Sequence, residues 1–191
     1  MRKEKLIILG AQGFISINLI KYLKKSDHNI LGIGNKTEYF KKIIKINKSH
    51  NLKIIQEDVF NIKKIAKYFT KRSQVVFLAG THYQKPNFLI NFKKLIYLCK
   101  KNRIDKFILI SSAAVYGNNN SINSEEIKTN PINSHGKFFL KLEKSIKKIF
   151  KNSEINYIIL RAFNVFGAYR KRPGVIEKMI LNNLNKENFY F

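Results

Sequence analysis

The stretch PINSHGKFFLKLE, at 131–143, contains a side chain that could move a proton near neutral pH. His135 stands close to the start of a lysine-rich helical pattern, and Phe139 follows one helical turn later on the same face. An imidazole titrates near neutral pH and can exchange a proton with an alcohol, so His135 is a candidate acid–base group. The alternative is that His135 only starts the helix.

A glycine turn, GAQGFIS at 10–16, is the second stretch that could do chemistry. Gly10 permits a tight turn, and Gly13 lets the backbone approach a pyrophosphate held at the positive end of a helix. Ser16 takes the third small position of the pattern. A glycine turn at the first strand–helix junction predicts a dinucleotide site, and a structural turn without a ligand is the alternative.

The elements that would position these residues follow from the apolar pattern, in which short runs alternate with longer runs at helical spacing. Continuously apolar strands such as VVFLA and FILIS are typical of a parallel sheet covered on both faces. The sequence therefore predicts an α/β fold, a doubly wound parallel sheet in three αβα layers, which binds ligands beyond the carboxyl ends of its strands. The predicted strands are 6–9, 30–33, 53–55, 75–78, 107–111 and 157–160, and the predicted helices are 13–24, 39–46, 62–68, 88–101, 134–150 and 175–184.

Composition narrows the class of partner. The 191 residues are 45% hydrophobic and carry a formal net charge of +25. A basic chain attracts phosphate, but the basic residues are mostly Lys and are spread along the sequence, which favours a solvated lysine coat over a specific nucleic-acid surface. One domain is expected from this length.

The single cysteine, Cys99, excludes an intramolecular disulfide and a metal site built on paired Cys, and we expect Cys99 in the core. We predict no metal site. No apolar run approaches the ~20 residues that span a bilayer, so no membrane partner is expected. The sequence favours a cytoplasmic protein.

Five motifs, taken in order, resemble those of the extended short-chain dehydrogenase/reductases, specifically the NAD-dependent epimerase/dehydratase family of nucleotide-sugar enzymes. GAQGFIS resembles the family's GxxGFIG, and LRAFNVFG at 160–167 is similar to its LRxFNVYG. Between them, EDV at 57–59 resembles GDV, FLAG at 77–80 resembles HLAA, and ISSAAVYG at 110–117 is similar to SSSAVYG. The resemblance covers most of the chain and implies a Rossmann-type fold.

The same resemblance implies NAD or NADP as cofactor, with Asp58 meeting the adenine and 78–80 beside a ribose. An NAD-preferring member would carry Asp or Glu at the end of the second strand, where this chain has GNK at 34–36. Lys36 favours NADP(H) or weak binding, unless it is incidental. The implied cofactor-binding residues are Gly10, Gln12, Gly13, Phe14, Ile15, Lys36, Asp58, Val59, Leu78, Ala79, Gly80 and Asn164.

The resemblance also implies what should stand at 131–143. The family has a Tyr-x-x-x-Lys pair there, in which Tyr moves a proton and Lys lowers the pKa of that Tyr and holds the nicotinamide ribose. Alignment on Gly136 and Glu143 places His135 in the Tyr position and Phe139 in the Lys position. Phe139 can neither carry charge nor donate a hydrogen bond to ribose.

Two functions are therefore open. In an active enzyme, a sugar hydroxyl is oxidised by hydride transfer to the nicotinamide, and Ser112, which matches the family's helper Ser, acts with His135 on the proton. In the alternative, the chain is a non-catalytic cofactor-binding module or a truncated pseudoenzyme. A nucleotide sugar is the expected substrate if the chain is active.

The resemblance implies, finally, that family members continue into a domain that binds the nucleotide sugar. We expect residues 1–185 to form the NAD(P)-binding domain and residues 186–191 to begin a truncated substrate domain. We expect this chain to lack most of that second domain. The helices at 88–101 and 134–150 could form the face of a homodimer, as in relatives.

Overall fold

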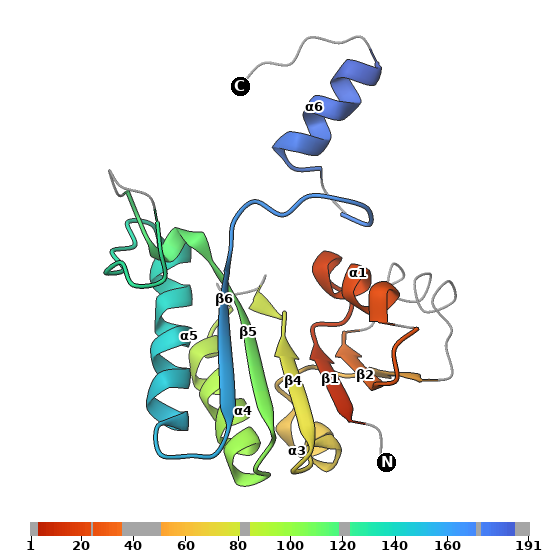
Figure 1. Ribbon diagram of the computed structural model, residues 1–191, viewed down its shortest axis with the longest axis vertical. Coiled ribbons are helices and arrows are strands. Elements are labelled where there is room, and N and C mark those ends of the chain that lie inside the picture. The colour runs from red at the N-terminus through yellow and green to blue at the C-terminus, as the bar shows by residue number, and fades with distance from the viewer. Residues whose placement is uncertain are drawn as a thin grey trace.

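Six parallel strands form one sheet in the order β3-β2-β1-β4-β5-β6 (Figure 1). The computed structural model describes residues 4–23, 25–35, 51–80, 85–118, 123–170 and 173–185. This strand order is that of the Rossmann fold, and it reverses between β1 and β4. The predicted fold class is confirmed. The strands are β1 (Lys5–Leu9), β2 (Asn29–Gly34), β3 (Leu52–Gln56), β4 (Ser73–Phe77), β5 (Lys106–Ser112) and β6 (Asn156–Ala162).

The helices lie between the strands as predicted. The predicted helix at 62–68 is one α-helical turn, α3, followed by a 3-10 turn, and β4 ends one residue earlier than predicted. The predicted helix at 39–46 and the predicted start of a second domain at 186–191 lie outside the described residues. The helical elements are α1 (Phe14–Leu23), α3 (Ile62–Ile65), η1 (Ala66–Tyr68), α4 (Phe88–Lys101), η3 (Ala113–Val115), α5 (Ser134–Phe150) and α6 (Val175–Leu184).

Two apolar layers cover the two faces of the sheet, because alternate strand residues point to opposite faces. Ile7 and Leu9 belong to the larger layer, which also contains buried residues of α3, α4 and α5. Leu6 and Ile8 belong to the smaller layer, with Ile20 of α1. Cys99 is fully buried in the larger layer, as predicted, and burial raises the pKa of its thiol.

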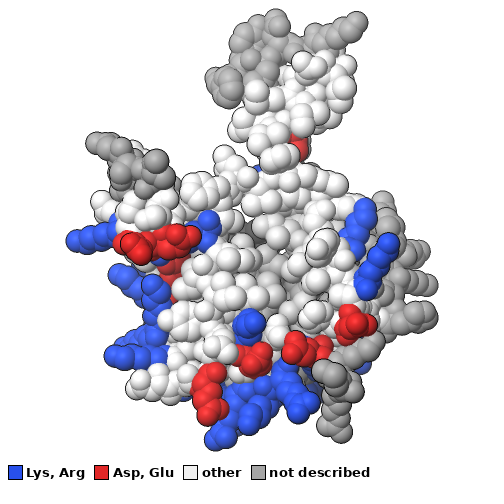
Figure 2. All heavy atoms as spheres, viewed as in Figure 1, with Lys and Arg blue, Asp and Glu red and all other residues white. Residues whose placement is uncertain are grey.

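The surface outside these layers carries both dispersed charged side chains and an exposed helix. In Figure 2 the Lys and Arg side chains are distributed around the periphery instead of forming a single patch, and acidic side chains lie among them along the lower edge. Helix α6 projects from the sheet (Figure 1), and Leu184 on it is 73% exposed. Within the described part of the chain, no helix is long and apolar enough to cross a membrane.

Candidate functional site

The glycine turn after β1 lies where three strands end. The backbone N–H groups of Gly10 and Ala11 donate to the Ile33 carbonyl of β2, at 2.9 and 3.0 Å. Gly10 has a φ of +88°, and a Cβ on it would lie 2.9 Å from the Ala79 Cα after β4. Any side chain at Gly10 would therefore strain the turn and push the β4 end away. The predicted residues Gly10, Leu78 and Ala79 are thus brought together.

Helix α1 begins directly behind this turn. The Ser16 hydroxyl is buried and donates to the Gly10 carbonyl at 2.7 Å, so Ser at the third small position locks the turn to the helix. Gly13 N–H donates to the same carbonyl at 2.9 Å. Among described atoms, a Cβ on Gly13 would meet only the Gly10 oxygen at 3.2 Å and Ser16 Oγ at 3.5 Å. The helix N-terminus and its bare backbone form a cradle suited to a phosphate.

The end of β3 supplies the predicted adenine side. Asp58 is exposed, and its carboxylate accepts from Phe60 N–H at 2.8 Å, which shapes the turn after β3. Val59 points into the core. Lys36, predicted to influence cofactor choice, lies outside the described residues.

The Gln12 side chain lies beside the end of β2. A Cβ on Gly34, the last residue of β2, would overlap Gln12 Oε1. That oxygen is buried, and it has no hydrogen-bond partner among the residues the structure describes. A buried acceptor without a donor is costly, so this atom fits a site completed by a ligand donor.

The nicotinamide side of the predicted site is filled by an aromatic ring. Phe139 is 7% exposed, and a Cβ on Gly80 would lie 2.9 Å from its Cζ. The His135 ring lies against Phe139, with centroids 4.8 Å apart. Phe139 therefore packs over the strand end at Gly80, where the family resemblance expects the cofactor's ribose.

The two predicted catalytic residues lie on segments that touch. Ser112 ends β5 and caps the 3-10 turn η3, its Oγ accepting from Ala114 N–H at 3.2 Å. Helix α5 is capped by Asn133, whose side chain accepts from Gly136 N–H at 2.7 Å. A Cβ on Gly136 would press on the Ala114 carbonyl, so glycine there lets the first turn of α5 lie on η3.

Burial lowers the pKa of His135 from its usual value, because desolvation penalises the imidazolium. Unfolded His titrates near ~6.5, so between the folded and unfolded pKa values the unfolded chain binds more protons. We therefore expect stability to fall as pH drops through this window, and the fall to be shallower in His135→Gln. Urea unfolding from pH 7.5 to pH 5 measures this, and parallel curves for the two proteins would contradict it.

A buried ion pair fixes the adjoining strand ends. Glu143 of α5 is 1% exposed and accepts from the Ser111 hydroxyl at 2.6 Å. Arg161 of β6 donates to both oxygens of the Glu143 carboxylate, at 3.2 and 2.9 Å, and its guanidinium lies over the Tyr116 ring. Hydrogen bonding to Glu143 raises the pKa of Arg161. This pair ties α5 to β5 and β6 next to Ser112.

The segment after β6 crosses to α1 (Figure 1). Asn18 donates to the Ala168 carbonyl at 2.9 Å, and the Arg170 guanidinium lies 5.9 Å from the centroid of the Phe14 ring. Asn164, predicted to bind cofactor, is exposed on this segment. The sequence alone did not indicate that Phe14 would be covered by residues more than 150 positions away.

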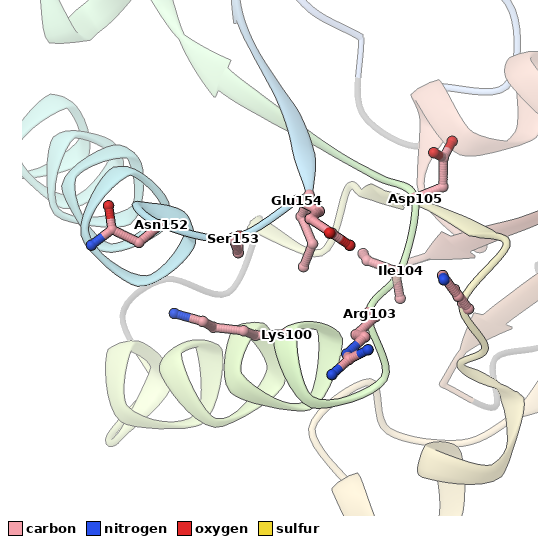
Figure 3. A pocket seen from close by; sticks show the side chains of 9 residues that line it. Lys100, Arg103, Ile104, Asp105, Asn152, Ser153 and Glu154 are labelled. Atoms are coloured by element: carbon pink, nitrogen blue, oxygen red, sulfur yellow. The ribbon is translucent and has the colours of Figure 1, made fainter.

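Two pockets lined by described residues lie away from this site. One, of about 390 Å³, is formed by the end of α4 and the turns that precede β5 and β6 (Figure 3). It lies at the amino ends of the strands, the opposite edge from the one where Rossmann folds bind ligands. The other lies between α4 and α5 and is lined by four lysines and four uncharged residues, namely Lys93, Lys141, Lys144, Lys148, Leu89, Tyr97, Ser145 and Ile149. Two-fold pairing through this face would bring like charges together, so the homodimer remains a prediction.

No group of three His, Cys, Asp or Glu side chains in the described ranges could hold a metal ion.

Comparison with known proteins gives matches along nearly the whole chain. A model of the NAD dependent epimerase/dehydratase family matches residues 6–191. The chain is 28% identical to a dTDP-D-glucose 4,6-dehydratase of Dictyostelium discoideum, over 94% of this chain and 49% of that protein. It is 26% identical to the UDP-glucuronic acid 4-epimerase of Bacillus cereus in complex with NAD, with a TM-score of 0.80 over 96% of this chain and 63% of that one.

A further solved structure, a UDP-N-acetylglucosamine 4-epimerase from Methanobrevibacter ruminantium M1, is 28% identical, with a TM-score of 0.82 over 98% of this chain and 64% of that one. The chain thus spans about half to two thirds of the length of these relatives.

Proposed function

Since the chain belongs to the NAD-dependent epimerase/dehydratase family, we propose that it binds NAD(H) or NADP(H) at the carboxyl edge of its sheet but does not carry out sugar oxidation. The observation that carries this proposal is the Phe139 ring packed on Gly80, in the position where the family resemblance expects a lysine.

The residues present suit the binding part of the proposal. The bare backbone at Gly10 and Gly13 and the N-terminus of α1 would hold the pyrophosphate. Gln12 Oε1, which has no hydrogen-bond partner among the described residues, offers an acceptor to the adenosine half. When bound, the nicotinamide ring supplies the hydride chemistry of the family.

The loss of catalysis follows from the residues on the nicotinamide side of the proposed cofactor site. A lysine at 139 would supply a charge that lowers an acid–base pKa and a donor that holds ribose, and the buried Phe139 ring supplies neither. Gly80 stands where the family motif HLAA has Ala, and it leaves the space that this ring occupies. The smaller residue at 80 and the ring at 139 are complementary in shape. This favours a repacked site over a simple loss of the lysine.

A second candidate function rests on His135. Burial lowers the pKa of His135, so its imidazole is neutral at physiological pH and could accept a proton from a sugar hydroxyl. Ser112, on the adjoining segment, could orient that hydroxyl. The chain would then be a nucleotide-sugar oxidoreductase with a variant acid–base group.

Dinucleotide binding tests the proposal. We expect the purified chain to bind NADH or NADPH, and Gly13→Val to weaken that binding by more than about tenfold, since a branched side chain at the helix N-terminus blocks the phosphate. Titration calorimetry and the fluorescence of the reduced nicotinamide measure both affinities.

The control is Lys101→Val, which introduces the same branched side chain at the exposed last residue of α4, at the opposite edge of the sheet from the glycine turn. It should leave dinucleotide affinity unchanged. If the unmodified chain binds neither dinucleotide at millimolar concentration, the proposed function is wrong.

A further inference from the structure

The position that recognises the adenosine ribose in Rossmann folds has no side chain in this protein. A carboxylate at the end of the second strand ordinarily accepts a hydrogen bond from the ribose 2′-hydroxyl. Here the second strand ends at Gly34, which has no side chain. The sequence predicts that this acceptor is lost, and Lys36, which lies outside the described residues, favours NADP(H) or weak binding on sequence grounds.

The space at Gly34 is not empty, however. A Cβ on Gly34 would overlap Gln12 Oε1, so the amide oxygen of Gln12 occupies the place where a residue-34 side chain would begin. The strand register explains how: Leu9 of β1 pairs with Ile33 of β2, so the turn that follows β1 lies beside the end of β2. Gln12 thus reaches over from the glycine turn.

The Gln12 oxygen is also the kind of hydrogen-bond acceptor that a ribose hydroxyl needs. It is buried and accepts no hydrogen bond from any described residue. Leaving such an acceptor unpaired costs free energy, which a donor from a bound ligand would recover. A hydroxyl can donate to it, whereas the oxygens of a 2′-phosphate are only acceptors and could be bound by Gln12 only if its amide turned to present the Nε2 donors.

We propose that Gln12 replaces the missing carboxylate, accepting the ribose 2′-hydroxyl through Oε1, and thereby selects NAD(H) over NADP(H). This inference rests on the proposed function, because it needs dinucleotide binding at the glycine turn. Rossmann proteins usually discriminate between NAD(H) and NADP(H) with a side chain at the end of the second strand. In this chain Gln12 does so from the glycine turn.

The test compares NADH and NADPH affinities, by nicotinamide fluorescence and calorimetry, in four proteins. The unmodified chain should bind NADH at least about tenfold more tightly than NADPH. Gln12→Met keeps the length of the side chain but removes the acceptor, and should weaken NADH about three- to tenfold with little change for NADPH. Gln74→Met makes the same change on β4, where Gln74 pairs with Glu4, and should leave both affinities unchanged.

The fourth protein, Gln12→Ala with Gly34→Asp, returns a carboxylate to the end of β2 in the space that Gln12 leaves. It should recover the preference for NADH by the route that Rossmann folds ordinarily use, which would show that the ribose site is still intact when Gln12 is replaced.

The outcomes separate the two proposals. If NADH binds but NADPH binds equally well, or if Gln12→Met has the affinities of the unmodified chain, the role of Gln12 is wrong while the proposed function stands. If neither dinucleotide binds the unmodified chain, both are wrong.

Discussion

Glu143→Ala is expected to lower the free energy of unfolding by about 3–5 kcal/mol, among the largest effects of any single change in this chain. Glu143 is 1% exposed, and both its carboxylate oxygens accept from Arg161, which is itself 13% exposed. Removing the carboxylate leaves a guanidinium buried without its counter-charge and the Ser111 hydroxyl without its acceptor. Because α5, β5 and β6 all meet at this pair, the loss should appear in the global unfolding transition.

Urea unfolding followed by circular dichroism measures this loss, and Glu57→Ala is the matched control. Glu57 is 20% exposed and pairs at 3.1 Å with Lys64, which is 68% exposed, so water screens this pair and can hydrate Lys64 once the carboxylate is removed. Its removal, which also takes away the acceptor of two local hydrogen bonds, should therefore change stability less. Glu143→Leu combined with Arg161→Met should be less destabilised than Glu143→Leu alone, since no buried charge then lacks a partner. Equal losses at Glu143 and Glu57 would contradict this account of the pair.

The architecture was readable from the sequence because local signals agree with it. The predicted bounds of α4, α5 and α6 are the observed ones. At α5 the reason is visible: Asn133 caps the start, and apolar residues recur at helical spacing until the chain turns at Asn152, whose φ is +64°. The strand order could not be read from periodicity alone, because it depends on which apolar faces meet. The resemblance implied a Rossmann-type fold, and the observed strand order is that of this fold.

The candidate site was only partly predictable, for a physical reason. The glycine turn is a local feature, since Gly10 and Gly13 act on the backbone within a few residues. The contacts that distinguish this chain join distant positions, Gly34 with Gln12 and Gly80 with Phe139. In each case a glycine at a strand end makes room for a larger side chain, and a sequence shows the glycine without showing what fills the space.

A screen of the chain against UDP-, GDP- and dTDP-sugars with both dinucleotides is expected to give no more than trace turnover. Positioned acid–base groups contribute about 10²–10⁴-fold to rate, and the buried Phe139 ring can neither tune a proton donor nor hold the nicotinamide ribose. Nicotinamide absorbance and mass spectrometry of the sugars measure turnover, and the Bacillus cereus UDP-glucuronic acid 4-epimerase serves as the positive control.

The decisive variants follow from the packing. His135→Ala should change the trace activity little, whereas clear turnover that disappears in His135→Ala would make His135 a working acid–base group and overturn the loss of catalysis.

Gly80→Ala alone should destabilise the chain by about 1–3 kcal/mol, because the added Cβ would lie 2.9 Å from Phe139 Cζ. The same change should be tolerated once Phe139→Lys removes the ring, and this coupling, measured by urea unfolding, tests whether the two positions changed together. With His135→Tyr added, the triple variant has the family's residues at all three positions, and it should bind the reduced nicotinamide more rigidly, seen as raised fluorescence anisotropy. If Gly80→Ala costs the same with and without Phe139, the ring does not fill that space and the argument from repacking fails.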